Sequence, residues 1–140
     1  MTAQIRQASC VIIDGRAVLI EGPPGSGKSS LALALIDRGA ILVGDDGVTL
    51  DVREGRIWAS APPNIAGLLE IRNIGLVSLP IGEGPVCLSI HLDRAAPRFV
   101  EEAQQREICG LQVPAISLFP GTHALALRAE WSVRKYAMTS

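Results

Sequence analysis

The segment Gly22-Pro23-Pro24-Gly25-Ser26-Gly27-Lys28-Ser29 has the pattern of a phosphate-binding loop, in which a glycine and four variable residues precede Gly-Lys-Ser. Consecutive backbone N–H groups can point inward at an anion only where the chain is free to adopt unusual backbone angles, which glycine permits. A helix that begins at such a loop adds unpaired N–H groups and the positive end of its dipole. Lys28 is expected to reach the β- and γ-phosphates, and the Ser29 hydroxyl is a potential Mg²⁺ ligand. Together with Ser30, this segment predicts a nucleotide-binding P-loop.

The residues on either side of the loop provide the strand and the helix that the pattern requires. An apolar run at residues 18–20 predicts a strand before the loop, and residues 28–38 predict a helix with Leu31 and Leu35 on its apolar face. Gly39 stands where a helix commonly ends on a glycine. The alternative, a glycine-rich turn that binds nothing, is disfavoured in this context.

The rest of the chain predicts more strands than helices. Two hairpins are expected around the turn dipeptides Asp14-Gly15 and Glu54-Gly55. Further strands are expected at residues 41–43, 76–79, 86–92 and 115–118, and a helix at about 123–136. With one strand–loop–helix unit near the start, this order predicts an α/β fold: a mixed, twisted β-sheet with few covering helices. We expect residues 1–140 to form a single domain.

Composition excludes several classes of function. The formal net charge is −1 and only 4% of the residues are aromatic, which argues against a nucleic-acid partner. No apolar stretch approaches the roughly 20 residues of a membrane-spanning helix, and the first residues lack a secretory signal, so we expect a cytoplasmic protein that does not bind a membrane. Cys10, Cys87 and Cys109 are widely spaced and odd in number, which favours buried free thiols over a disulfide or a zinc site.

Two further segments carry candidate catalytic groups, and each also has an ordinary structural interpretation. Asp45 and Asp46 follow the expected strand at 41–43, where carboxylates beside a phosphate loop can hold Mg²⁺ or accept a hydroxyl proton. The same residues, with the glycine that follows them, also fit a turn that opens a hairpin. Glu70 and Arg72 lie on one side of an extended segment, and from the residues alone a solvated strand face with a surface ion pair is the favoured interpretation.

Three blocks of the sequence resemble the catalytic domain of the bacterial HPr kinase/phosphorylase family. The blocks are residues 18–30, 38–46 and 68–77, and the similarity extends from about 7 to 118. Members of this family phosphorylate, and can dephosphorylate, a serine of the phosphocarrier protein HPr. The resemblance implies the HPr kinase/PEP carboxykinase-like fold, use of ATP and Mg²⁺, HPr as partner, and a hexamer. The compact length is similar to that of the short alphaproteobacterial members.

The resemblance also implies roles for individual residues. Asp45 matches the family's general base, and Lys28 matches the catalytic loop lysine. Ser29 and Glu70 match the magnesium ligands, while Arg72 lies in the block that is important for both reactions. In addition, Asp46 remains a candidate magnesium ligand, and Arg98 in Pro97-Arg98-Phe99 resembles a catalytic arginine.

Two positions depart from the family pattern. Gln7 stands where a histidine is usual, and glutamine can hydrogen-bond but cannot relay a proton. A loop that usually reads Arg-Pro-Gly-Arg is here Phe119-Pro120-Gly121-Thr122-His123, without either arginine. These departures weigh against the phosphorylase reaction more than against the kinase reaction. His123 itself is more typical of a surface or capping residue than of a replacement for an arginine.

Two other functions stay open at this point. One is a non-catalytic ATP sensor, which Gln7 and the missing arginines would suit. The other is a small-molecule kinase that uses the same loop, although no arginine-rich lid is visible in the sequence. The two tryptophans, Trp58 and Trp131, are expected in the core or at an interface rather than in a base-stacking site.

Overall fold

The computed structural model describes residues 3–64, 66–121 and 123–138 of the 140-residue chain. In chain order its elements are β1 (Gln4–Arg6), β2 (Ser9–Ile13), β3 (Arg16–Glu21), α1 (Lys28–Asp37), β4 (Ile41–Gly44), β5 (Val48–Arg53), β6 (Arg56–Ser60), β7 (Leu68–Ile71), β8 (Gly75–Ser78), β9 (Gly84–Leu92), β10 (Gln104–Ile108), β11 (Leu111–Leu118) and α2 (Leu125–Tyr136). Among the described residues, no helix is long and apolar enough to cross a membrane.

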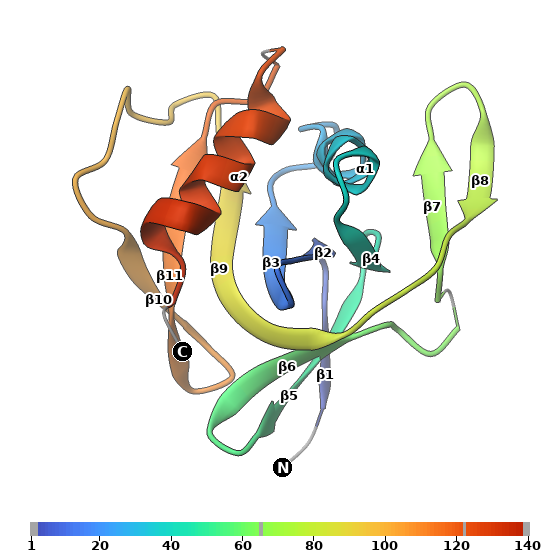
Figure 1. Cartoon of the computed structure of the whole chain (residues 1–140), viewed down its shortest axis with the longest axis horizontal. Helices are drawn as coiled ribbons and strands as arrows, with labels where there is room; N and C mark the ends of the chain where they lie inside the picture. Colours follow the sequence, from blue (N-terminus) through green and yellow to red (C-terminus); the bar gives the residue numbers. More distant parts are fainter. Residues whose placement is uncertain (1–2, 65, 122, 139–140) are drawn as a thin grey trace.

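A strongly curved nine-stranded sheet forms the centre of the structure (Figure 1). Its main path is β1-β5-β6-β9-β3-β2-β4, and the β10–β11 hairpin joins it through β11 and β9. The pairs β3–β9 and β9–β11 are parallel, whereas the other pairs in the sheet are antiparallel. The long strand β9 pairs with β6 near its start and with β3 and β11 further along, so it links the two halves of the sheet. The structure therefore confirms the expected mixed sheet with few helices.

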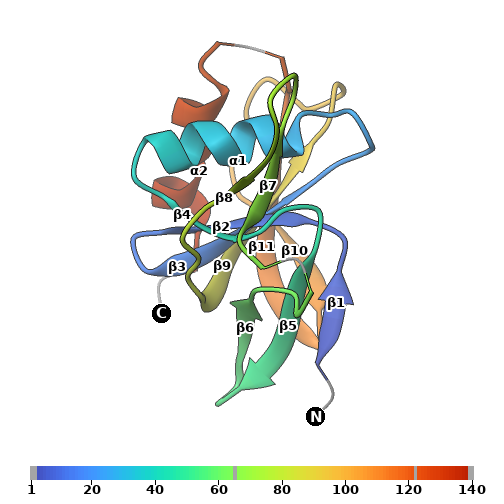
Figure 2. The same ribbon diagram turned by 90° about the vertical axis from the view of Figure 1, so that its right-hand side faces the viewer.

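Both helices cover the same face of the central strands, while β1, β5, β6 and β10 lie on the other side (Figures 1 and 2). The helices contribute Leu31, Leu35, Ala129 and Val133 to one apolar cluster, which they share with Val18, Ile20, Leu88 and Ile90 of the sheet. The opposite face forms a second cluster that includes Cys10, Leu19, Leu50, Ile57 and Ile108. Because successive side chains of a strand point to opposite faces, β3 is buried on both sides, which explains its continuous apolar run.

The β7–β8 hairpin is a separate two-stranded sheet that stands beside α1 (Figures 1 and 2). Leu69 is its buried anchor, whereas Ile74 and Leu76 near its tip are 73% and 67% exposed. The hairpin thus carries Glu70 close to the start of α1 while most of its own surface faces solvent.

Several sequence-based expectations need correction. Strands β1 and β10 were not predicted, because both are short and polar edge strands without a clear alternation of apolar residues. Strand β11 begins at Leu111 rather than at residue 115. The helix expected from residue 123 begins at Leu125.

One prediction of burial also needs correction. Cys10 and Cys87 are buried free thiols as expected, but Cys109 is only half-buried. Of the two tryptophans expected in the core or at an interface, Trp131 is 63% exposed and lies outside the core, and Trp58 is half-buried.

Candidate active site

The segment between β3 and α1 forms a tight glycine-rich loop. A Cβ atom on Gly22 would lie 2.6 Å from Ser26 Oγ and 3.1 Å from the carbonyl oxygen of Leu92, so no larger residue fits there without displacement. Gly27, with a φ of 102°, is the N-cap of α1. Lys28 Nζ donates a hydrogen bond of 2.9 Å to the carbonyl oxygen of Gly22, which folds the lysine back over the loop.

This loop has donors suited to an anion. Among the described residues no side chain caps the N-terminus of α1, and its own first turn contains no acidic residue, so its backbone N–H groups are left to bind an anion. The hydroxyl oxygen Ser26 Oγ is buried and has no hydrogen-bond partner among the described residues. A buried polar atom without a partner is rare in folded proteins, and a bound anion that accepts from this hydroxyl is one explanation for it. The residues of the loop therefore fit a phosphate group.

The carboxylate of Asp45 lies beside the start of α1 and joins three parts of the fold. Its Oδ1 accepts hydrogen bonds from Ser29 Oγ at 2.7 Å and from Ser9 Oγ at 3.0 Å. Its Oδ2 accepts a hydrogen bond of 3.3 Å from the backbone N–H of Glu70. Asp45 thus connects the loop–helix junction, strand β2 and the β7–β8 hairpin.

The turn after β4 aims Asp45 at the loop. A Cβ atom on Gly44 would lie only 2.0 Å from the carbonyl oxygen of Gly47, so the chain reverses too tightly for any other residue at position 44. Asp46 has a φ of 59°, in the left-handed region. Aspartate tolerates this region better than most residues do, because its short polar side chain can hydrogen-bond locally.

A cavity of about 490 Å³ lies in front of these groups. Its lining residues are Gln7, Gly22, Pro24, Gly25, Ser26, Gly27, Lys28, Ser29, Ser30, Asp45, Asp46, Glu70 and Arg72. Of the site residues expected from the sequence, only Pro23 and Arg98 do not line it. Pro23 nevertheless shapes the loop, because its carbonyl oxygen accepts a hydrogen bond of 3.1 Å from the Ser26 N–H.

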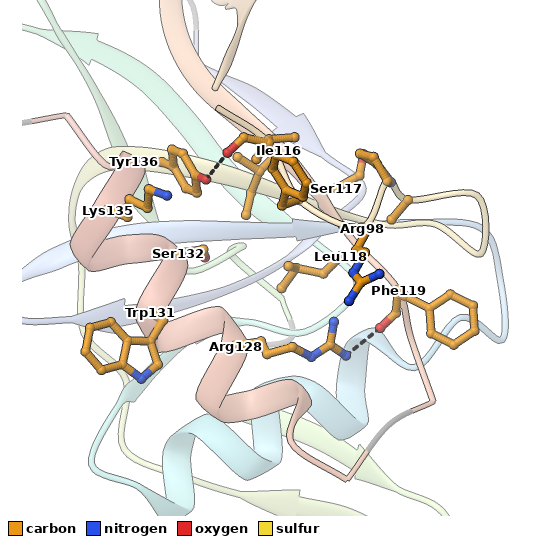
Figure 3. Close-up of a pocket in the computed structure, with 14 residues that line it drawn as sticks. Arg98, Ile116, Ser117, Leu118, Phe119, Arg128, Trp131, Ser132, Lys135 and Tyr136 are labelled. Atoms are coloured by element: carbon orange, nitrogen blue, oxygen red, sulfur yellow. Dashed lines mark hydrogen bonds between the residues drawn. The ribbon is translucent and has the colours of Figure 1, made fainter. Parts of the chain in front are cut away.

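Arg98 lines a different cavity, of about 550 Å³, between α2, β11 and the chain that follows β9 (Figure 3). Its walls include Phe119, Trp131 and Tyr136, and Arg128 donates a hydrogen bond of 2.7 Å to the carbonyl oxygen of Phe119. The structure therefore does not bring Arg98 to the cavity that contains Asp45. His123 is exposed and lines neither cavity.

The oxygen ligands for a divalent cation are few. Among the described residues, no three His, Cys, Asp or Glu side chains gather closely enough to hold a metal ion. Ser29, Asp46 and Glu70 nevertheless offer hydroxyl and carboxylate oxygens to the cavity. Mg²⁺ typically binds with one or two carboxylates, several waters and substrate phosphates, so this set fits Mg²⁺ bound together with a nucleotide.

Glu21, a further carboxylate next to the loop, was not singled out in the sequence analysis. Glu21 ends β3, and its side chain is only 12% exposed. Arg6 Nε lies 2.6 Å from Oε2, while Arg106 Nη1 at 2.6 Å and Ser89 Oγ at 3.0 Å donate to Oε1. Burial alone would raise the pKa of Glu21, but the hydrogen bond and charge of Arg6 and the charge of Arg106 outweigh it and hold that pKa below its ordinary value.

This network joins parts of the curved sheet that are not paired with each other. Arg6 belongs to the edge strand β1 and Arg106 to the edge strand β10, so Glu21 connects two sheet edges at the residue where the loop begins. The sequence offered one signal for this network, because the charged Glu21 directly follows the apolar run of β3. Its partners Arg6 and Arg106 are distant along the chain, so the sequence did not reveal them. Ser9 was missed for a similar reason, because it looked like one residue of an apolar strand.

The fold is of the HPr kinase type. The structure is similar to a solved structure of the HPr(Ser) kinase/phosphatase from Coxiella burnetii, with a TM-score of 0.83 and 33% sequence identity. The similarity covers 94% of this chain and 88% of the Coxiella chain. The family model described as HPr Serine kinase C-terminal domain matches residues 2–127. The chain therefore belongs to the HPr kinase C-terminal domain family.

Similar curated proteins are named HPr kinase/phosphorylase. The chain is 43% identical over 72 residues to the HPr kinase/phosphorylase of Clostridium tetani, an alignment that covers 50% of this chain and 24% of the relative. It is 35% identical over 132 residues to the HPr kinase/phosphorylase of Lacticaseibacillus casei, covering 83% of this chain and 41% of the relative. The chain thus spans less than half the length of these relatives.

Proposed function

We propose that this protein is an ATP-dependent kinase that phosphorylates a serine of the phosphocarrier protein HPr. The observation that carries the proposal is the position of Asp45, whose carboxylate is hydrogen-bonded to Ser29 at the start of α1 and lines the same cavity as the glycine-rich loop. A carboxylate in this place can accept the proton of an alcohol that is presented to a phosphate in the loop. Membership of the HPr kinase family supports a serine of HPr as that alcohol.

The loop from Gly22 to Ser30 would act as a P-loop and bind the phosphates of ATP. Its uncapped helix N-terminus and the Ser26 hydroxyl would donate to phosphate oxygens. Lys28 would exchange its bond to the Gly22 carbonyl for the β- and γ-phosphates. Ser29, Asp46 and Glu70 would hold Mg²⁺, which when bound neutralises charge on the β- and γ-phosphate oxygens.

In the transfer step, the hydroxyl oxygen of the HPr serine forms a bond to the γ-phosphorus of ATP, and the bond from that phosphorus to the β–γ bridging oxygen breaks, so ADP leaves. Asp45 accepts the proton of the serine hydroxyl. Lys28 stabilises the charge that develops on the transferred phosphoryl group. Arg72 lines the cavity and would contact the incoming HPr or the phosphoprotein product.

Phosphorolytic dephosphorylation would use the same groups in reverse, with Asp45 returning the proton to serine. The absence of both arginines from the loop at 119–123 leads us to propose the kinase reaction as the main activity. Assembly as a hexamer, and relatedness to the short alphaproteobacterial members, are further proposals that rest on family resemblance alone. Light scattering of the purified protein tests the assembly.

The transfer is tested with purified protein, Mg²⁺, radiolabelled ATP and cognate HPr. We expect Asp45→Ala to bind ATP nearly normally but to lose phosphate transfer, and Lys28→Ala to weaken ATP binding. Asp37→Ala is the matched control, because Asp37 is exposed at the last residue of α1 and does not line the cavity. Loss of ATP binding together with transfer in Asp45→Ala would contradict the role of a base.

The same assay separates the alternatives. ATP binding without transfer to HPr would favour a non-catalytic ATP sensor. Transfer to a small molecule but not to HPr would favour a small-molecule kinase. Incubation of phospho-HPr with inorganic phosphate then tests the reverse reaction directly.

A further inference from the structure

Ser9 is the one donor to Asp45 that lies wholly inside the sheet. It is the first residue of β2 and has no exposed surface. Its Oγ donates a hydrogen bond of 3.0 Å to Asp45 Oδ1 and accepts one of 3.3 Å from the backbone N–H of Asp46. A serine hydroxyl has one proton to donate and lone pairs to accept with, so both bonds form at once.

Through these two hydrogen bonds, Ser9 contacts both the side chain of Asp45 and the backbone of Asp46. The turn after β4 places Asp46 in the left-handed region, and Ser9 satisfies the N–H of that residue. The same hydroxyl restrains the carboxylate of the preceding residue. Ser9 therefore couples the conformation of the turn to the direction in which Asp45 points.

The other two donors to Asp45 belong to parts of the site that a substrate would contact. Ser29 lies at the loop–helix junction, is half-buried and is also the proposed magnesium ligand. Glu70 is exposed and belongs to the β7–β8 hairpin, and its N–H is 3.3 Å from Oδ2. Of these donors among the described residues, Ser9 is the one that is fully buried and does not line the cavity, so no substrate contact competes for its hydroxyl.

The distribution of donors over the two carboxylate oxygens is unequal. Each oxygen of a carboxylate has about two lone-pair directions. Ser9 and Ser29 occupy both directions of Oδ1, whereas Oδ2 receives, from the described residues, only the longer bond from the backbone of Glu70. Oδ2 is thus the oxygen with capacity left for a substrate hydroxyl.

From this geometry we infer that Ser9 is a positioning residue, which holds Asp45 so that Oδ2 faces the incoming serine hydroxyl. The inference rests on the proposed function, in which Asp45 is the general base. Ser9 touches neither ATP nor the protein substrate in this arrangement, and it acts only through Asp45 and Asp46. Removing its hydroxyl should therefore slow the transfer step and leave ATP binding intact.

The test compares Ser9→Ala with Ser9→Thr, which keeps the hydroxyl. We expect Ser9→Ala to lower kcat about 10- to 100-fold while the KM for ATP changes less than about twofold, because a hydrogen bond to a charged group is lost without loss of a nucleotide contact. Ser9→Thr should restore kcat to within about threefold of the wild type. Should Ser9→Ala fold poorly, Ser9→Cys is nearly isosteric but a weak donor, and it should show the same loss of kcat.

Ser89→Ala is the matched control. Ser89 is also a fully buried serine on a strand and also donates to a carboxylate, that of Glu21, but it does not line the cavity. We expect its kcat to stay within about twofold of the wild type even if its melting temperature falls. Equal loss of kcat in the Ser9 and Ser89 variants, or a loss in Ser9→Ala that appears in the KM for ATP, would overturn the positioning role.

A second measurement separates failure of this inference from failure of the proposed function. Amide hydrogen exchange of the apo protein should show the Asp46 N–H exchanging faster in Ser9→Ala than in the wild type and in Ser89→Ala, because Ser9 Oγ is the acceptor for that N–H. Unchanged exchange would refute the contact itself. A wild type that exchanges as expected but transfers no phosphate to HPr would instead refute the proposed function, and with it any catalytic consequence of Ser9.

Discussion

Glu21 stands at the point where the chain leaves the sheet for the glycine-rich loop, and replacing it with glutamine removes one negative charge without changing the shape of the side chain. Glu21 is 12% exposed, and its two arginine partners differ in exposure: Arg6 is 24% exposed and Arg106 is 41% exposed. The variant leaves the Arg6 guanidinium largely buried without its counter-charge. We therefore expect a clear loss of stability.

The size of the loss follows from this exposure. Breaking a fully buried ion pair by removing one partner costs about 3–5 kcal/mol, whereas an exposed pair contributes about 0–1 kcal/mol. The pair with Arg6 is mostly buried and the pair with Arg106 is largely solvated, and glutamine keeps one oxygen acceptor. We expect Glu21→Gln to lower the free energy of unfolding by about 2–3 kcal/mol at pH 7.

The loss should depend on pH in a defined direction. Because the folded protein holds the pKa of Glu21 below its ordinary value, the ionised group contributes stability that is present above the unfolded pKa of about 4.3 and is lost as pH falls through the folded pKa. The difference between wild type and Glu21→Gln should therefore be largest near neutral pH and should shrink below about pH 4.

Urea unfolding followed by circular dichroism at pH 7 and at about pH 3 measures both effects. Glu130→Gln is the control, because Glu130 pairs with Arg38, whose side chain is 47% exposed, and this change should cost less than about 1 kcal/mol. A Glu21→Gln protein as stable as the control at pH 7, or a difference that grows as the pH falls, would refute the reasoning.

Three further predictions concern single positions. Gly44→Ala places a Cβ atom 2.0 Å from the carbonyl oxygen of Gly47, so it should destabilise the fold by about 2 kcal/mol or more and reduce transfer, as thermal unfolding and the HPr assay would show. Ser26→Ala removes a buried hydroxyl without a partner in the described structure, so the melting temperature of the apo protein should not fall while titration calorimetry shows weaker ATP binding. Burial raises the pKa of the Cys87 thiol to about 11, so at pH 8 a thiol reagent should modify the half-buried Cys109 first and Cys87 only after denaturation.

The local elements around the loop were predictable from the sequence. The hairpins at Asp14-Gly15 and Glu54-Gly55 form as expected, and all four turn residues have positive φ, as a two-residue hairpin turn of this type requires. The helix expected at 28–38 is α1, Lys28–Asp37. These elements depend on residues within a few positions of each other, so their signals are contained in short stretches of sequence.

The polar edges of the sheet and the surroundings of single side chains were not predictable. The strands β1 and β10 have mostly exposed side chains, so no apolar alternation marks them, and they exist because β5 and β11 offer unpaired edges. Arg98 was expected near the catalytic groups but lines the separate cavity between α2 and β11, since its place depends on how the chain after β9 packs against α2.

The sequence alone determined that a glycine-rich loop joins a buried strand to a helix, because the glycine spacing and the apolar run act on the backbone locally. Only the tertiary structure decided that Ser9, Ser29 and the Glu70 N–H converge on one carboxylate, at separations of 36, 16 and 25 residues from Asp45. The period of a strand tells which face a side chain occupies but not which strand lies beside it. The pairing of β4 with β2, and the packing of the β7–β8 hairpin against α1, bring these donors to Asp45.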